Sequence, residues 1–163
     1  PLLSFGFKKF CEMASNVGVS GMIIPDLPLE EASQFSNIAN SCNLDLILLV
    51  APTTPYERMK NISLKTKGFT YLVSVTGVTG ERSNLENRVE NLINALKEMS
   101  SNPVAVGFGI SSPQHVKKVK NWGADGVIIG SAFVKRIYET KKDLIVNEVS
   151  EFCQNMRKAA DEN

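Results

Sequence analysis

Five short apolar runs, rich in β-branched residues, recur along this chain and constrain its fold more than any other feature. They occupy residues 21–25, 46–50, 69–75, 104–106 and 126–129. Because each run is almost continuously apolar, we expect parallel strands, covered by helices on one face and by packed side chains on the other. Strands that alternate with helical segments of this length form right-handed βαβ units. The pattern therefore predicts an α/β fold.

Helix signals lie between these runs. Thr54, Pro55 and Glu57 fit a capping box with proline in the first turn, and Ser112 followed by Pro113 fits a second helix start. Two segments carry apolar residues at helical spacing, which predicts helices that face the core. The first stripe comprises Val89, Leu92, Ile93, Leu96 and Met99, and the second comprises Ile145, Val149, Phe152 and Met156.

Two architectures fit five strand–helix units: an open doubly wound sheet and a (β/α)₈ barrel. Glycines at successive strand ends near the C-terminus favour the barrel, whose phosphate sites typically follow the seventh and eighth strands. A complete barrel needs about 250 residues, whereas this chain has 163 and begins at Pro1. We therefore interpret it as an incomplete barrel of about five βα units, without about three units at its N-terminus.

Three glycine-bearing strand ends predict a phosphate site. They are 77–80 (Gly-Val-Thr-Gly), 107–109 (Gly-Phe-Gly) and 130–131 (Gly-Ser). Glycine lets backbone N–H groups approach an anion closely, and a following helix adds its positive N-terminal end. We expect these loops to hold a phosphorylated small molecule.

Composition narrows the class of function. The formal net charge is +1, and Lys and Arg do not form a basic stripe, so nucleic-acid binding is not expected. No apolar run is long enough to cross a bilayer, and no membrane association is expected. Cys11, Cys42 and Cys153 lack metal-ligand spacing, which predicts reduced, mostly buried thiols and no metal site. His115 follows a helix start and is interpreted as a surface or capping residue.

Six ordered motifs point to one family. They are Ile-Pro-Asp-Leu-Pro at 24–28, Ala-Pro-Thr-Thr-Pro at 51–55, Tyr-Leu-Val-Ser at 71–74, Gly-Val-Thr-Gly at 77–80, Gly-Phe-Gly-Ile-Ser at 107–111 and Gly-Ser-Ala at 130–132. In order and spacing, the set resembles the tryptophan synthase alpha subunit. The resemblance covers essentially the whole chain, from just after the third barrel strand to the C-terminal helix. It implies a single domain over 1–163, part of a (β/α)₈ TIM barrel.

The resemblance also implies a reaction. Members of this family are lyases of tryptophan biosynthesis. They split indole-3-glycerol phosphate into indole and glyceraldehyde 3-phosphate by a retro-aldol step, without a cofactor. The acid and base are a Glu at the end of the second strand and an Asp in the next loop, and both would precede Pro1. The chain is thus expected to contain no catalytic acid or base and, alone, to be inactive.

The resemblance assigns substrate-phosphate binding to Gly80, Gly109, Gly130 and Ser131. Their backbone N–H groups, and the hydroxyl of Ser131, are suitable donors to phosphate oxygens. Ordinary turn and helix-cap chemistry is the alternative for each residue taken singly.

Four further residues match the indole end of the family's site. Tyr71 corresponds to a tyrosine that lines the indole pocket near the catalytic acid, and Thr79 to a loop threonine that contacts the catalytic Asp when the loop closes. Ile23 and Leu49 match apolar pocket walls. Buried structural roles are the alternative for Tyr71, Ile23 and Leu49.

The family implies a partner, the pyridoxal-phosphate-dependent beta subunit, in an alpha2beta2 tetramer. Asp26, Leu27 and Pro28 lie in the loop that matches one docking segment, and residues 1–5 match part of a second. An ordinary helix start is the alternative for the first segment. The implied location is the cytoplasm, or the plastid stroma for a photosynthetic eukaryote.

Three alternative functions remain open from the sequence. The first is a stand-alone indole-releasing lyase of the same family. The second is a non-catalytic subunit that binds and activates a beta partner. The third is a different phosphate-binding barrel, such as a sugar-phosphate isomerase or epimerase, which would lack the ordered motifs at 25–28 and 77–80.

Overall fold

The computed structural model describes residues 1–73, 82–107 and 109–162, and describes 82–87 by their backbone alone. The strands of these residues are β1 (Gly21–Ile23), β2 (Asp45–Ile47), β3 (Leu49–Val50), β4 (Thr70–Val73), β5 (Val104–Gly107) and β6 (Gly126–Val127). The helices are α1 (Leu2–Phe5), α2 (Phe7–Asn16), α3 (Leu29–Ser41), α4 (Tyr56–Lys65), α5 (Arg82–Met99), α6 (Pro113–Asn121), α7 (Ser131–Glu139) and α8 (Ile145–Asp161). Within the described ranges, no helix has the length and apolar character that a membrane span requires.

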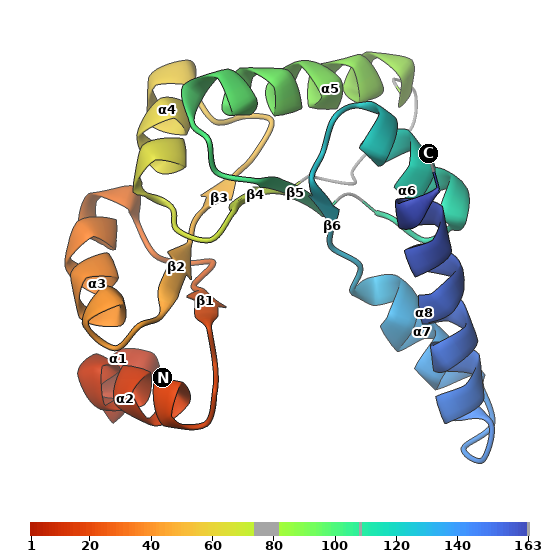
Figure 1. Cartoon of the computed structure of the whole chain (residues 1–163), viewed down its shortest axis with the longest axis horizontal. Coiled ribbons are helices and arrows are strands. Elements are labelled where there is room, and N and C mark those ends of the chain that lie inside the picture. Colours follow the sequence, from red (N-terminus) through yellow and green to blue (C-terminus); the bar gives the residue numbers. More distant parts are fainter. Residues whose placement is uncertain (74–81, 108, 163) are drawn as a thin grey trace.

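All strand pairs are parallel, as the apolar runs predicted. β1 pairs with β2, and a second sheet has the order β3-β4-β5-β6. Figure 1 shows the strands along the inner side of an arch, with α3 to α6 along its outer side. A helix follows β1, the successive strands β2 and β3, and each of β4, β5 and β6, so the described residues form five βα units.

The two faces of the sheet differ in burial. On the helix side, Leu72, Val104 and Val106 are fully buried. They alternate with Tyr71 and Ala105, which face the inner side of the arch and are half-buried. The expectation that packed side chains fill the second face is therefore wrong for the described residues, because the inner face is only partly covered.

The helical stripes predicted from sequence supply the cover. Val89, Ile93 and Leu96 of α5 are buried, while Leu92 and Met99 pack at the edge of the same core. On α8, Phe152 and Met156 are also buried. The 3.6-residue period therefore located the core-facing side of both helices correctly.

A second, smaller core lies near the N-terminus. We call it the amino-terminal cluster, and its buried residues are Phe7, Cys11, Ala14, Ala39 and Leu44. Met22, Ile24 and Phe35 are packed against both this cluster and the main core. The ring of Phe7 meets that of Phe35 edge to face, with 4.7 Å between centroids.

The predicted strand at 46–50 is interrupted at Leu48. Its backbone N–H donates to Oγ1 of Thr66 at 2.9 Å, and the Thr66 hydroxyl donates to the carbonyl of Phe69 at 2.8 Å. Thr66 is 1% exposed, so its hydroxyl satisfies two backbone groups inside the protein. The side chain thereby takes the place of one strand-to-strand bond, and β2 and β3 belong to different sheets.

One helix start was predicted correctly and one was not. Ser112 caps α6, since its hydroxyl accepts a hydrogen bond from the N–H of His115. The capping box at Thr54 is wrong: α4 begins at Tyr56 after Pro55, and Oγ1 of Thr54 accepts from Ala51 N–H at 3.0 Å. Thr54 closes the β3–α4 loop, because its side chain points back to the strand end.

The cysteines are free, and they differ in exposure. Cys11 is buried, Cys42 is half-buried and Cys153 is exposed, so the expectation of mostly buried thiols is wrong for Cys153. Burial raises the pKa of the Cys11 thiol, with smaller contributions in the same direction from Cys42 and Glu12.

Candidate functional site

The carboxyl ends of the strands lie along one edge of the sheet, because all pairs are parallel. Leu49 is in register with Tyr71, Tyr71 with Ala105, and Ala105 with Gly126. The carboxyl ends of β3, β4, β5 and β6 therefore lie side by side. The segment 77–80, with Thr79 and Gly80, lies outside the described residues, as does Phe108.

Gly130 and Ser131 stand where β6 runs into α7. The N–H of Ile128 donates to Val106 O at 2.9 Å, which extends the pairing of β6 towards this turn. Gly130 is the N-cap of α7 without a side-chain cap, and Ser131 is its first residue and is exposed. A Cβ at Gly130 would meet no atom of the described residues within 4 Å. Among those residues nothing covers the N-terminus of α7 at this turn, an arrangement that binds anions in many proteins.

Gly109 lies at the neighbouring strand end. Its φ is 45°, a left-handed conformation that favours glycine, and it is exposed. The next residue, Ile110, is 3% exposed and anchors the loop in the main core. Gly109 and Gly130 thus follow adjacent strands, β5 and β6, as the prediction of a shared phosphate site requires.

His115 belongs to the start of α6. It is exposed, its Nδ1 accepts from the Ser111 N–H at 3.3 Å, and its own N–H completes the Ser112 cap. The interpretation of His115 as a surface and capping residue is confirmed.

Tyr71 lies across Gly107 on the inner face. A Cβ built at Gly107 would lie 2.5 Å from the Tyr71 hydroxyl oxygen and 2.6 Å from Cε2. The Tyr71 ring occupies the space that the side chain of any other residue at 107 would need. The Tyr71 hydroxyl therefore lies beside the carboxyl end of β5. Sequence reasoning attributed Gly107 to phosphate binding alone. The contact follows from the strand register, which pairs Tyr71 with Ala105 and so places Gly107 two residues further along the same face, and no motif in the sequence reports it.

The two residues predicted to form pocket walls, Leu49 and Ile23, differ in burial. Leu49 is half-buried on β3, next to Tyr71 in the sheet. Ile23 is 39% exposed at the end of β1, which belongs to the other sheet. Ile23 is therefore not a core residue, and a role for either side chain against an indole ring stays a prediction.

The predicted docking loop follows β1. Asp26 and Pro28 are exposed, whereas Leu27 packs against the main core and its N–H donates to Ile24 O at 3.2 Å. Pro28 is the N-cap of α3, so the expected helix start is present here. In the second predicted segment, Leu3 is 72% and Phe5 49% exposed.

Carboxylates with lowered pKa values also lie away from this edge. Burial alone would raise the pKa of Asp125, but hydrogen bonds from Val104 N–H and Lys97 lower it. Since Val104 is the first residue of β5, Asp125 lies at the amino edge of the sheet. The Arg58 guanidinium lowers the pKa of Glu30 to about 2 in a pair that joins α3 to α4.

Among the residues that the structure describes, no group of three or more His, Cys, Asp or Glu side chains is arranged to hold a metal ion.

Comparison with known proteins identifies the family. The model of the tryptophan synthase alpha chain family matches residues 1–161. The chain belongs to this family. The tryptophan synthase alpha chain of Prochlorococcus marinus subsp. pastoris is 71% identical over 162 residues, which are 99% of this chain and 58% of that protein. The chain spans about 60% of the length of the curated relatives it matches.

Solved structures of the family show the same fold. The tryptophan synthase A-subunit of Pyrococcus furiosus is 36% identical, with a TM-score of 0.85 over 97% of this chain and 63% of that one. A chain of the tryptophan synthase complex from the same organism is 34% identical, with a TM-score of 0.84 over 97% and 62%. The predicted family and the incomplete (β/α)₈ barrel are confirmed, and a doubly wound sheet or an unrelated phosphate barrel is excluded.

Proposed function

We propose that this chain acts in the cleavage of indole-3-glycerol phosphate to indole and glyceraldehyde 3-phosphate, the lyase step of tryptophan biosynthesis. The observation that carries the proposal is the match to the tryptophan synthase alpha chain family over residues 1–161. The relatives named for this subunit support it, at up to 71% identity among those compared. We assign no acid or base to these 163 residues, so their proposed part is to hold the substrate.

The proposed phosphate site is the edge formed after β5 and β6. Gly109, Gly130 and Ser131 would donate backbone N–H groups, and Ser131 also its hydroxyl, together with Gly80. The open space at Gly130 and the free N-terminus of α7 support this assignment. No charged side chain is needed, because oriented amides and the helix dipole favour an anion.

The proposed indole end lies further along the same inner face. Tyr71 and Leu49, adjacent on β4 and β3, would flank the ring, and Ile23 would contribute from the end of β1. We propose that Thr79 supports the acid–base chemistry from the loop after β4. The half-exposed positions of Leu49 and Tyr71 leave apolar surface available to a flat aromatic ligand.

The proposed partner is a tryptophan synthase beta subunit. A related chain is a component of the tryptophan synthase complex of Pyrococcus furiosus, which supports this assignment. Asp26 and Pro28 are exposed beside the strand ends, and the apolar side chains of Leu3 and Phe5 are also exposed. We propose both segments as docking surfaces.

Calorimetry with glycerol 3-phosphate tests the phosphate site. Gly130→Val should weaken binding by at least about tenfold, equal to about 1.4 kcal/mol. The new side chain meets open space in the protein, so stability should change by no more than about 0.5 kcal/mol. Gly126→Ala, which makes only an ordinary 3.6 Å contact with Ala105, is the control. Unchanged affinity in Gly130→Val would remove this turn from the site.

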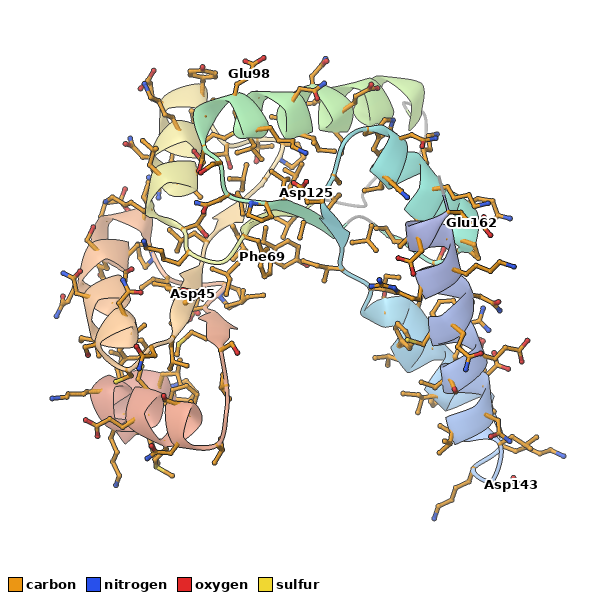
Figure 2. The ribbon with its side chains drawn as sticks, viewed as in Figure 1. Asp45, Phe69, Glu98, Asp125, Asp143 and Glu162 are labelled. Carbon is orange, nitrogen blue, oxygen red and sulfur yellow. The ribbon has the colours of Figure 1, made fainter. Side chains whose placement is uncertain are left out.

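Sedimentation of the protein mixed with a tryptophan synthase beta subunit tests the partner. Asp26→Lys should weaken association while glycerol 3-phosphate binding is retained, since a rim charge acts mainly on encounter. The control is Asp143→Lys, which makes the same charge change at the exposed turn between α7 and α8 (Figure 2). If wild type associates and neither variant changes that association, the loop at Asp26 is not a docking surface. If wild type does not associate at all, a stand-alone lyase is favoured.

A further inference from the structure

Helix α7 carries the proposed phosphate turn, yet none of its residues is fully buried. Val134, Ile137 and Tyr138 are 65%, 45% and 90% exposed. Its orientation therefore depends on the contacts that it makes with its neighbours, chiefly α8, which runs beside it (Figure 1).

Three of the side-chain contacts between α7 and α8 converge on one turn of α8. The rings of Phe133 and Phe152 meet edge to face, with 4.8 Å between centroids. The guanidinium of Arg136 lies over the Phe152 ring, 4.0 Å from its centroid, and also pairs with Glu148. Phe133 and Arg136 are three residues apart on α7, and Glu148 and Phe152 are four apart on α8, so each pair shares one helix face.

These contacts are connected to the phosphate turn through the backbone. The N–H of Phe133 donates to Gly130 O at 2.9 Å, so Phe133 lies in the same helical turn as Ser131. A nine-residue helix behaves as a short rigid rod about 13 Å long. Fixing it at both Phe133 and Arg136 sets its tilt, whereas Phe133 alone would leave a pivot.

We propose that Arg136 is a positioning residue for phosphate binding, which acts through α7 by its stack on Phe152 and its pair with Glu148. The inference rests on the proposed function of the Gly130–Ser131 turn. Phe152 is 4% exposed and belongs to the main core, so it offers Arg136 a fixed surface. Arg136 suits this task because its planar group can stack on a ring and pair with a carboxylate at once.

The proposal can be tested by calorimetry with two probes, glycerol 3-phosphate and indole, on the protein in the form that its source cell produces. Arg136→Gln should weaken glycerol 3-phosphate binding about fivefold or more, since both the ion pair and the cation–π contact are lost. Indole affinity should change less than about twofold, because α7 does not carry the proposed indole end. Arg136→Lys keeps the charge but not the planar stack, and should fall between wild type and Arg136→Gln.

Lys135→Gln is the matched control. Lys135 precedes Arg136 on α7, but its ion pair is with Glu139 of the same helix, and its side chain is 72% exposed. This variant loses the same charge near the same anion, so it measures the direct electrostatic effect. Affinity for glycerol 3-phosphate should stay within about twofold of wild type.

The outcomes separate the two proposals. If wild type binds glycerol 3-phosphate and Arg136→Gln binds it equally well, or if the control loses as much, Arg136 is not a positioning residue. Equal losses for glycerol 3-phosphate and indole would show a general structural role and also overturn the inference. Wild type that does not bind glycerol 3-phosphate would overturn the proposed function, and this inference with it.

Discussion

The helix-covered face of the sheet and its inner face differ in how completely their side chains are buried. On the covered face, Leu72 and Val106 are fully buried, and the contacts of α5 and α8 fill the main core. On the inner face, Leu49 and Tyr71 are only half-buried, and glycine at 107 leaves room for a neighbouring ring. The covered face thus stabilises the barrel segment, and the inner face keeps surface that a ligand can use.

The largest expected difference between the two faces is in stability. Leu72→Ala should lower the free energy of unfolding by about 2–5 kcal/mol, because a fully buried leucine leaves a cavity. Leu49→Ala, on the next strand but half-exposed, should cost no more than about half as much. Urea unfolding of the two variants measures this. Equal losses would mean that the inner face is as tightly packed as the covered one.

The next largest loss of stability is expected where the inner face is closely packed, at Gly107 beside the Tyr71 ring. Gly107→Ala should cost about 1–3 kcal/mol, since the new methyl group must displace the Tyr71 ring. The near-ultraviolet circular dichroism of tyrosine should change with it. Gly126→Ala on the neighbouring strand should cost no more than about 1 kcal/mol, because its nearest contact is an ordinary 3.6 Å. A harmless Gly107→Ala would show that the ring moves freely.

A polar exception within the buried side should give a slightly smaller effect. Thr66→Val keeps the shape of the side chain but leaves the N–H of Leu48 and the carbonyl of Phe69 without their partner. Loss of stability by about 1–2 kcal/mol is expected. Thermal unfolding followed by far-ultraviolet circular dichroism measures it, and an unaltered midpoint would mean that backbone or water replaces the hydroxyl.

The smallest expected effect on stability comes from Asp125 at the amino edge of the sheet, and this effect depends on pH. The pKa of Asp125 is lower in the folded protein than the ordinary 3.8, so its ionised form stabilises the fold above that pH. This stabilisation is lost as pH falls through the lowered folded pKa. The difference in melting temperature between wild type and Asp125→Asn should therefore be present at pH 7 and shrink below about pH 4. A difference independent of pH would assign the effect to packing.

Sequence reasoning located what depends on local pattern. The strand runs, the apolar stripes of α5 and α8, and the Ser112 cap follow from spacing within one segment, and all were predicted. The ordered motifs also identified the family, because six motifs in fixed order are more specific than any one of them.

Two of the parts that sequence reasoning missed depend on residues far apart in the chain. The break at Leu48 needs Thr66, and the glycine at 107 needs Tyr71. The cap at Thr54 failed because its hydroxyl bonds backwards to Ala51 instead of forwards into α4. No pattern within one segment reports which of two local partners a hydroxyl chooses, or what lies across a strand pair.

The division of the interior into two cores has a consequence for how the molecule comes apart. The amino-terminal cluster is joined to the main core by the β1–β2 strand pair, by shared residues such as Phe35, and by an exposed Arg58–Glu30 pair that contributes little. Residues 1–44 should therefore open as a cooperative unit before β3–β6 do. Amide hydrogens of α2 and α3 should exchange sooner than those of β4 and β5, and under rising urea the protein should lose its first helices while its central strands are still protected.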